Sequence, residues 1–139
     1  MDTTNFGEGR SNGEREAAEY VEARLQALGL SPELFEPEPN RASVVARVPG
    51  RNSDKPALVL HGHLDVVPAD PRTWSVDPPS RARSRTACCG GRGAVDMKDM
   101  DAMILGALGD ILRSGRCRSA NSWSPSSPTK RPGGGVGAS

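Results

Sequence analysis

An apolar segment that ends in two histidines and an aspartate places the strongest constraint on the fold of this chain. Residues 55–60, "KPALVL", have the composition of a buried strand, and Pro68 ends any further sheet pairing. The polar side chains of His61, His63 and Asp65 follow where this strand leaves its sheet. In open α/β sheets, sites form beyond the carboxyl ends of strands, so the segment predicts an α/β fold with a site at this edge.

Two amphipathic helices and a second strand are predicted around this segment. Residues 11–29 suit a helix, with Ser11 and Glu14 at the spacing of a capping box. Residues 96–115 suit a second helix, and residues 42–50 suit a strand. The apolar stripes are Ala17, Val21, Leu25 and Leu28 in the first helix and Met100, Ile104, Leu108 and Ile111 in the second.

Length and composition indicate one modest domain. The chain has 139 residues, of which 35% are hydrophobic, and no apolar run long enough to span a membrane. The first 16 residues are polar and do not resemble a signal peptide. We therefore expect a soluble, cytoplasmic protein that binds no membrane.

Two segments differ from the rest of the chain. Residues 80–90 and 117–139 hold six of the 18 Lys and Arg residues, none of the 17 acidic residues and all three cysteines. Residues from 119 onward are rich in Ser, Pro and Gly, which predicts disorder. The basic run at 81–85 lacks the aromatic residues of a nucleic-acid site, and the adjacent Cys88 and Cys89 lack zinc-site spacing. We expect neither nucleic acid nor a cysteine-bound metal.

The strongest chemical signal is the motif "HGHLD" together with a later aspartate. His63 and Asp65 lie two apart on an extended chain, so their side chains project to the same side and the carboxylate can orient the imidazole towards a metal. Histidines that are merely hydrogen-bonded at a strand end are the alternative. Asp96 precedes the second helix, where it is either a site carboxylate or an ordinary N-cap.

Four motifs together resemble the zinc-dependent peptidase and deacylase family of acetylornithine deacetylase, succinyl-diaminopimelate desuccinylase, aminoacylase and glutamate carboxypeptidase. They are "DTTNFGEG", "LVLHGHLDVVP", "TWSVDPP" and "GRGAVDMKDM", in that order along the chain. The resemblance runs from Met1 to about Gly115. It implies that residues 1–115 are the N-terminal part of a truncated catalytic domain with a mixed sheet flanked by helices.

The resemblance also implies roles for individual residues. His63 would bind one of two zinc ions, Asp96 would bridge both ions, and Asp65 would orient His63 and count as catalytic. His61 receives no role. Cobalt would substitute for zinc, the substrate would be a small peptide or N-acyl amino acid, and the full-length protein would be compatible with a homodimer. The family's general base is a glutamate in a Glu-Glu pair, and no glutamate follows Glu38 here.

A shift of reading frame offers an explanation for the missing pair. A shifted frame over residues 120–133 permits "ELVVAFLADEEAGG", and the same shift over residues 79–91 permits "FAGEI-x-DG-x-LWG". These are the segments that lack acidic residues. We interpret residues 80–90 and 116–139 as out of frame. A metal-dependent hydrolase of amide bonds, inactive as this fragment, is therefore expected, and an unstable, non-enzymatic product of a degraded gene is the alternative.

Overall fold

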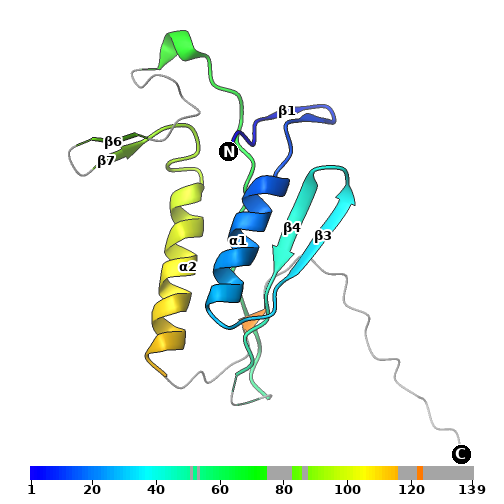
Figure 1. Ribbon diagram of the computed structural model, residues 1–139, viewed down its shortest axis with the longest axis vertical. Helices are drawn as coiled ribbons and strands as arrows, with labels where there is room; N and C mark the ends of the chain where they lie inside the picture. The colour runs from blue at the N-terminus through cyan, green and yellow to red at the C-terminus, as the bar shows by residue number, and fades with distance from the viewer. Residues whose placement is uncertain (51, 53, 75–82, 86–87, 116–121, 124–139) are drawn as a thin grey trace, which may run out of the picture.

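The computed structural model describes residues 1–50, 52, 54–74, 83–85, 88–115 and 122–123. Two helices and a set of short strands make up this part of the chain (Figure 1). In chain order the elements are β1 Asn5–Gly7, β2 Arg10–Ser11, α1 Arg15–Ala27, β3 Glu33–Glu38, β4 Arg41–Val45, β5 Leu58–Val59, the 3₁₀ turn η1 Pro71–Thr73, β6 Arg83–Arg85, β7 Cys88–Gly90, α2 Lys98–Arg113 and β8 Ser122–Trp123.

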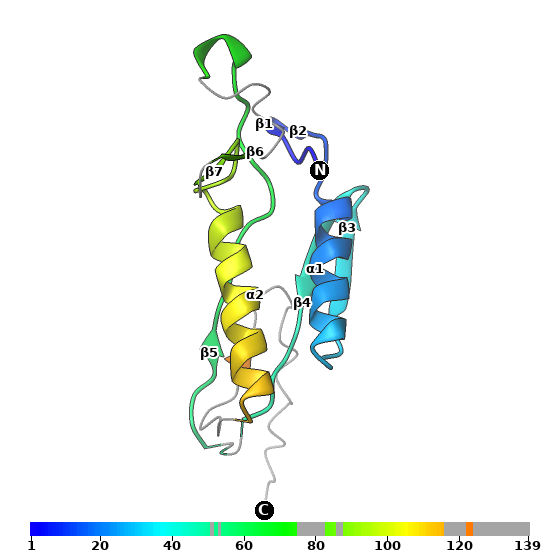
Figure 2. The same cartoon turned by 60° about the vertical axis from the view of Figure 1, so that its left-hand side comes forward.

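The two helices run in the same direction, and the chain that follows β5 runs in the opposite direction (Figures 1 and 2). The amino ends of both helices therefore lie at the same end of the molecule as the residues that follow β5. Strand pairs are β1–β2, β3–β4 and β6–β7, all antiparallel, and β5–β8, which is parallel. This mixed α/β arrangement is the fold class that the sequence predicts.

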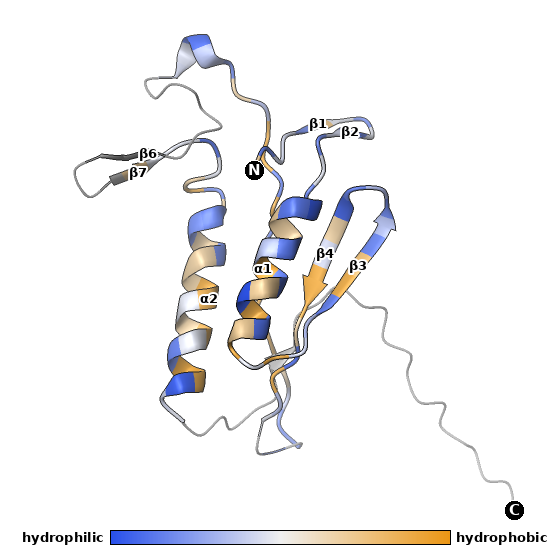
Figure 3. Ribbon diagram, in the orientation of Figure 1, coloured by the Kyte–Doolittle hydropathy of each residue, from blue (hydrophilic) through white to orange (hydrophobic). Residues whose placement is uncertain are grey.

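Helix α1 packs on the β3–β4 hairpin and forms most of the core. Ala17, Ala18 and Leu25 of α1 are buried against Ala42 and Val45 of β4. The apolar residues of β4 gather towards its carboxyl end, whereas the hairpin turn is hydrophilic (Figure 3). The predicted apolar stripe of the first helix is thus confirmed at Ala17 and Leu25.

The start of α1 differs from the prediction. The helix begins at Arg15, and Ser11 lies in β2, where its hydroxyl accepts from the backbone N–H of Gly13 at 3.0 Å. The Asn40 carbonyl in the hairpin turn instead accepts from the N–H groups of Glu14 and Arg15, at 2.7 and 3.2 Å. The predicted capping box is therefore wrong, because the hairpin turn satisfies these helix donors.

The apolar face of α2 is also rotated from the predicted one. Ile104 and Leu108 line a partly open cavity, as the stripe predicts, but Met100 is 44% exposed and Ile111 is 41% exposed. Leu105 and Asp101 take the inward positions instead. A periodic pattern in the sequence shows that a helix has an apolar face. Which residues of that face point inward depends on the elements that pack against the helix.

The strands are shorter than predicted. β4 ends at Val45, although Val48 is also buried at 3% exposure, and β5 contains only Leu58 and Val59. Its partner β8 lies in the tail that was predicted to be disordered, so that prediction is wrong for Ser122 and Trp123. The rest of the tail lies outside the described residues. Within the described ranges, neither helix has the length and apolar character needed to cross a bilayer.

Candidate metal site

The site lies where the N-terminal segment runs beside the residues that follow β5. Asn5 N–H donates to the Val66 carbonyl at 2.8 Å, and Val66 N–H donates to the Thr3 carbonyl at 3.1 Å. The Thr3 hydroxyl, in a residue only 1% exposed, donates to the Leu64 carbonyl at 2.7 Å. These bonds hold the chain around Asp65 from one side.

His63, Asp65 and Asp96, the three site residues that the sequence predicts, come together in the structure. The Nδ1 atom of His63 lies 3.1 Å from Oδ1 of Asp65 and 3.1 Å from the Asp65 carbonyl oxygen. The Nε2 atom lies 3.2 Å from Oδ1 of Asp96, which comes from the loop before α2. His63 thus contacts a carboxylate 33 positions away in sequence on one side of its ring and Asp65 on the other.

Both ring nitrogens of His63 face only oxygen acceptors. A neutral imidazole has one donor nitrogen, so it cannot donate to Asp65 and Asp96 at once. Partial burial acts to lower the pKa of His63, but the hydrogen bonds and charges of Asp65 and Asp96 outweigh it and hold the pKa above the ordinary 6.5. The arrangement therefore favours a cation, either a proton on Nε2 or a metal ion between Nε2 and Asp96.

The separation of these two atoms suits a shared metal. Zinc binds imidazole nitrogen and carboxylate oxygen at about 2.0–2.2 Å, so two ligands of one tetrahedral ion lie about 3.4 Å apart. His63 Nε2 and Asp96 Oδ1 are 3.2 Å apart. Asp65 engages the opposite nitrogen, so Nε2 is the nitrogen that could bind a metal. No further His, Cys, Asp or Glu completes a cluster of three metal-binding side chains among the described residues.

Asp96 is not the N-cap of α2. Met97 occupies that position, with no side-chain capping bond, and the Asp96 side chain is 85% exposed. The Asp96–Met97 peptide bond is cis. The alternative reading of Asp96 as an ordinary helix cap is therefore wrong, and its carboxylate contacts His63 instead.

Two charged residues of α2 lie behind the site, and the sequence did not reveal them. Lys98 Nζ donates to the Thr3 hydroxyl at 2.8 Å, and partial burial lowers the pKa of Lys98. Burial raises the pKa of Asp101. A Cβ atom at Gly62 would collide with the Asp101 carboxylate, so the glycine between the histidines lets α2 approach this segment closely.

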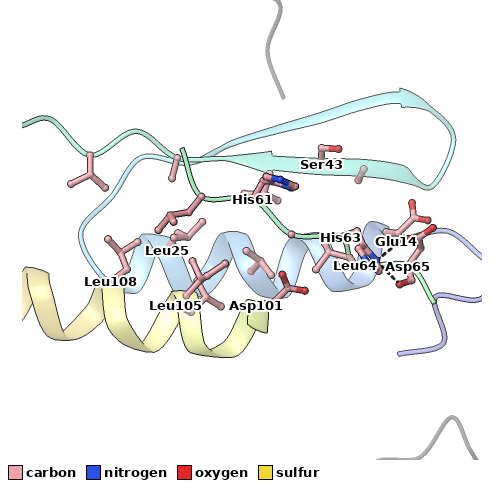
Figure 4. Close-up of a pocket in the computed structure, with 18 of the residues that line it drawn as sticks. Glu14, Leu25, Ser43, His61, His63, Leu64, Asp65, Asp101, Leu105 and Leu108 are labelled. Atoms are coloured by element: carbon pink, nitrogen blue, oxygen red, sulfur yellow. Dashed lines mark hydrogen bonds and ion pairs between the residues drawn. The ribbon is translucent and has the colours of Figure 1, made fainter. Parts of the chain in front are cut away.

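A cavity of about 360 Å³ extends from the site between the helices and the strands (Figure 4). His63 and Asp65 lie at one end of it together with Glu14, and Leu108 lies towards the other end. Glu14 is buried and pairs with Arg41 at 3.2 Å. His61 also lines this cavity. The two histidines of the motif therefore occupy different surroundings, and His63 is the one placed between carboxylates.

Comparison with known proteins gives the same family as the sequence motifs. Residues 59–121 match the family described as Peptidase family M20/M25/M40. Aminoacylase-1 of Mus musculus is 31% identical over 99 residues, covering 71% of this chain and 24% of that enzyme. Succinyl-diaminopimelate desuccinylase of Delftia acidovorans is 38% identical over 98 residues, covering 68% and 25%. Cysteinylglycine-S-conjugate dipeptidase of Corynebacterium striatum is 37% identical over 101 residues, covering 72% and 22%.

Solved structures share the fold. Human carnosine dipeptidase 1 superposes with a TM-score of 0.60 at 21% identity, over 79% of this chain and 25% of that one. The dipeptidase Dug1p of Saccharomyces cerevisiae gives 0.61 at 19% identity, over 79% and 26%. The chain spans about a quarter of the length of the relatives it matches. By these matches, the chain belongs to the M20/M25/M40 peptidase family.

Proposed function

We propose that this chain carries part of the metal site of an amide-bond hydrolase. In this proposal His63 and Asp96 bind zinc, with cobalt as a substitute, and Asp65 orients the His63 ring. The observation that carries the proposal is that both nitrogens of His63 face carboxylate oxygens, at 3.1 and 3.2 Å. An imidazole held in this way favours a cation at Nε2.

The substrate class follows from the relatives. Their names describe an aminoacylase, a desuccinylase and dipeptidases. We propose a small peptide or an N-acyl amino acid as the substrate of the complete protein. A bound zinc would polarise the scissile carbonyl and lower the pKa of a bound water. The chain's own residues would hold this metal, through Nε2 of His63 and the Asp96 carboxylate, and keep the ring oriented through Asp65.

The chain as written lacks the glutamate base that the family resemblance implies. No glutamate follows Glu38, and Glu14, which lies near His63, is already paired with Arg41 at 3.2 Å. A water bound at the site therefore has no evident proton acceptor, and the loss of a general base costs about 10²- to 10⁴-fold in rate. We propose that this chain binds metal weakly and does not turn over substrate.

A reading-frame shift accounts for this gap in our proposal. We propose that residues 80–90 and 116–139 are translated out of frame and that residues 1–115 otherwise represent the N-terminal part of the catalytic domain. Resequencing the gene across the codons for Pro78–Gly91 and Arg113–Ser139 tests this directly. A sequence that encodes the same residues again would refute a sequencing error, and a shifted frame without a Glu-Glu pair would refute the proposed origin.

A non-enzymatic, unstable product is the second candidate. It is favoured by large apolar side chains at the surface: Leu58 of β5 is 59% exposed, Leu60 just after β5 is 46% exposed, and Val95 in the loop before α2 is 82% exposed. Exposed apolar strand residues promote aggregation and degradation. A purified chain that aggregates and binds no zinc would favour this candidate over the hydrolase fragment.

Substitution of the two ligands tests the metal site. In a frame-restored, full-length protein, His63→Ala and Asp96→Ala should each lose bound zinc and activity, measured by elemental analysis and hydrolysis of N-acyl amino acids. His61→Ala is the matched control and should retain zinc. Normal zinc content in both ligand variants would overturn the assignment.

Asp65 is tested separately because it would act through His63. Asp65→Asn removes the charge behind the ring without removing a proposed ligand, so most of the zinc should remain while turnover falls. The same protein and the same two measurements apply. Unchanged turnover would return Asp65 to a purely structural role.

A further inference from the structure

We propose that Asn5 is a positioning residue that fixes the Asp65 carboxylate against His63, an inference that rests on the metal site proposed above. Asn5 belongs to the motif "DTTNFGEG", for which the metal chemistry provides no role. Its side-chain amide Nδ2 donates to Oδ2 of Asp65 at 2.8 Å. The other oxygen of the same carboxylate, Oδ1, lies 3.1 Å from Nδ1 of His63.

The amide of Asn5 is held in one orientation. Its Oδ1 atom accepts from the backbone N–H of Gly7 at 3.0 Å, so the NH₂ group must be the end that faces Asp65. An amide with both ends engaged is a fixed donor. Asn5 therefore holds Oδ2 of Asp65, while Oδ1 of the same carboxylate pairs electrostatically with Nδ1 of His63, whose hydrogen bond goes to the Asp65 carbonyl oxygen at 3.1 Å. The carboxylate plane cannot rotate without losing the Asn5 bond or the pairing with His63.

The backbone of Asn5 is anchored to the same segment. Its N–H donates to the Val66 carbonyl at 2.8 Å. The Thr3 carbonyl accepts from Val66 N–H at 3.1 Å, and the Thr3 hydroxyl donates to the Leu64 carbonyl at 2.7 Å. Lys98 Nζ donates to the Thr3 hydroxyl at 2.8 Å, which ties the segment to α2. The N-terminal segment Thr3–Asn5 thus sets both the position of the Asp65 backbone and the orientation of its carboxylate.

Asn5 would therefore affect the metal indirectly, through Asp65 and then His63. Groups that orient a metal-binding histidine typically change metal affinity about 10- to 100-fold when removed. Asn5→Ala should therefore weaken zinc binding about tenfold, and Asn5→Asp, which is of the same size but places a carboxylate against Asp65, should weaken it more. Asn12→Ala, at an exposed position of the same N-terminal region, is the matched control and should leave zinc affinity unchanged.

A double-mutant cycle distinguishes positioning from a general effect on the fold. Zinc affinity of the full chain is measured by competition with a chelator for Asn5→Ala, Asp65→Ala and the double variant. If Asn5 acts through Asp65, the double variant should bind no more weakly than Asp65→Ala alone. Additive losses, or an Asn5→Ala variant with unchanged affinity, would overturn the proposal. Circular dichroism of Asn5→Asp checks that the fold is retained.

A metal-free measurement separates this inference from the metal site itself. Side-chain ¹⁵N NMR at a pH where His63 is neutral reports which ring nitrogen carries the proton. The wild-type chain should place it on Nδ1, facing Asp65, and Asn5→Ala should shift the population towards Nε2. If zinc fails to bind the wild type but this shift occurs, the metal site is refuted and the role of Asn5 stands. An unchanged tautomer in Asn5→Ala refutes the role of Asn5.

Discussion

Two regions of the molecule differ in how they bury apolar side chains: the α1–β3–β4 unit, residues 15–45, and the β5–α2 region, residues 58–113. In the first unit the helix packs on a hairpin that follows it directly, and Ala17, Ala18 and Leu25 are buried. In the second region Gly109 is the buried residue of α2, and β5 pairs over two residues. Contacts between neighbouring elements in the sequence bury the core of the first unit, whereas the second region depends on partners that are distant in sequence.

The candidate site lies in the second region, where the N-terminal segment docks on it. Lys98 begins α2 and Asp96 comes from the loop before it. His63 and Asp65 follow β5, and Asn5 precedes α1. Hydrogen bonds between residues 60 to 95 positions apart hold it together. The site should therefore be less stable than the first unit and more sensitive to what covers β5 and α2.

The largest expected effect comes from restoring the reading frame over residues 80–90 and 117–132. The restored tail would supply an apolar strand beside β5 and the Glu-Glu pair, whereas the present β8 pairs at Ser122 and Trp123. We expect hydrolysis of N-acyl amino acids or dipeptides at least about 10²-fold above the chain as written. A zinc-supplemented hydrolysis assay on both proteins measures it.

The two regions should also differ in how they unfold. The chain as written should lack a single cooperative transition by circular dichroism, with α1 formed, and the restored protein should gain one. Cooperative unfolding together with zinc-dependent turnover in the chain as written would contradict both the proposed fragment and the contrast between the regions.

A pair of core truncations compares the regions at the level of packing. Leu25→Ala removes a side chain that is 7% exposed and should destabilise the first unit by about 2–4 kcal/mol. Ile111→Ala removes one that is 41% exposed and should cost less than about 1 kcal/mol. Native-state hydrogen exchange of α1 and α2 amides measures both. Equal losses would remove the distinction between the two regions.

Two glycine substitutions should change the stability by smaller amounts and in opposite directions. Gly13 has φ +85°, and a Cβ there would collide with Asn40 in the turn that caps α1, so Gly13→Ala should destabilise the chain by about 1–3 kcal/mol. Gly106 lies in α2 with open space around it, and Gly106→Ala should stabilise that helix by up to about 1 kcal/mol. Urea titrations of the frame-restored protein, followed by circular dichroism, test the signs.

The smallest expected effect is the pH dependence of the metal-free site. The pKa of His63 is raised above 6.5, because hydrogen bonds and charges from Asp65 and Asp96 outweigh partial burial. The stabilisation from protonated His63 is therefore complete below pH 6.5 and is lost as the pH rises through the raised pKa. Asp96→Asn should move this pKa down, as measured by an NMR titration of His63. An unchanged or higher pKa would show that Asp96 does not face the ring in solution.

Much of the fold was predictable where it depends on local pattern. The stripe of Ala17 and Leu25 identified α1, and the apolar residues before His61 identified the strand ahead of the site. β3 was missed because Pro37 and three glutamates within "ELFEPE" do not suggest a strand. The capping of α1 by the Asn40 carbonyl was also missed, since a backbone group leaves no signature in sequence.

The site was predictable only as far as its motifs reach. His63, Asp65 and Asp96 were named because their spacing matched a family pattern, and the structure brings them into contact. Asn5 and Lys98 were missed because their bonds, to Asp65 and Thr3, depend on how the N-terminal segment docks. Such contacts follow from tertiary packing, which composition and periodicity do not encode.

The central claim is that His63 is the histidine that binds metal, and the chain contains an internal control because His61 and His63 are its two histidines. A zinc titration followed by side-chain ¹⁵N NMR tests it directly. We predict that the Nε2 signal of His63 moves to a metal-bound position while both signals of His61 stay where they are. A shift of His61 with His63 unchanged, or no shift of either ring at saturating zinc, would contradict the account.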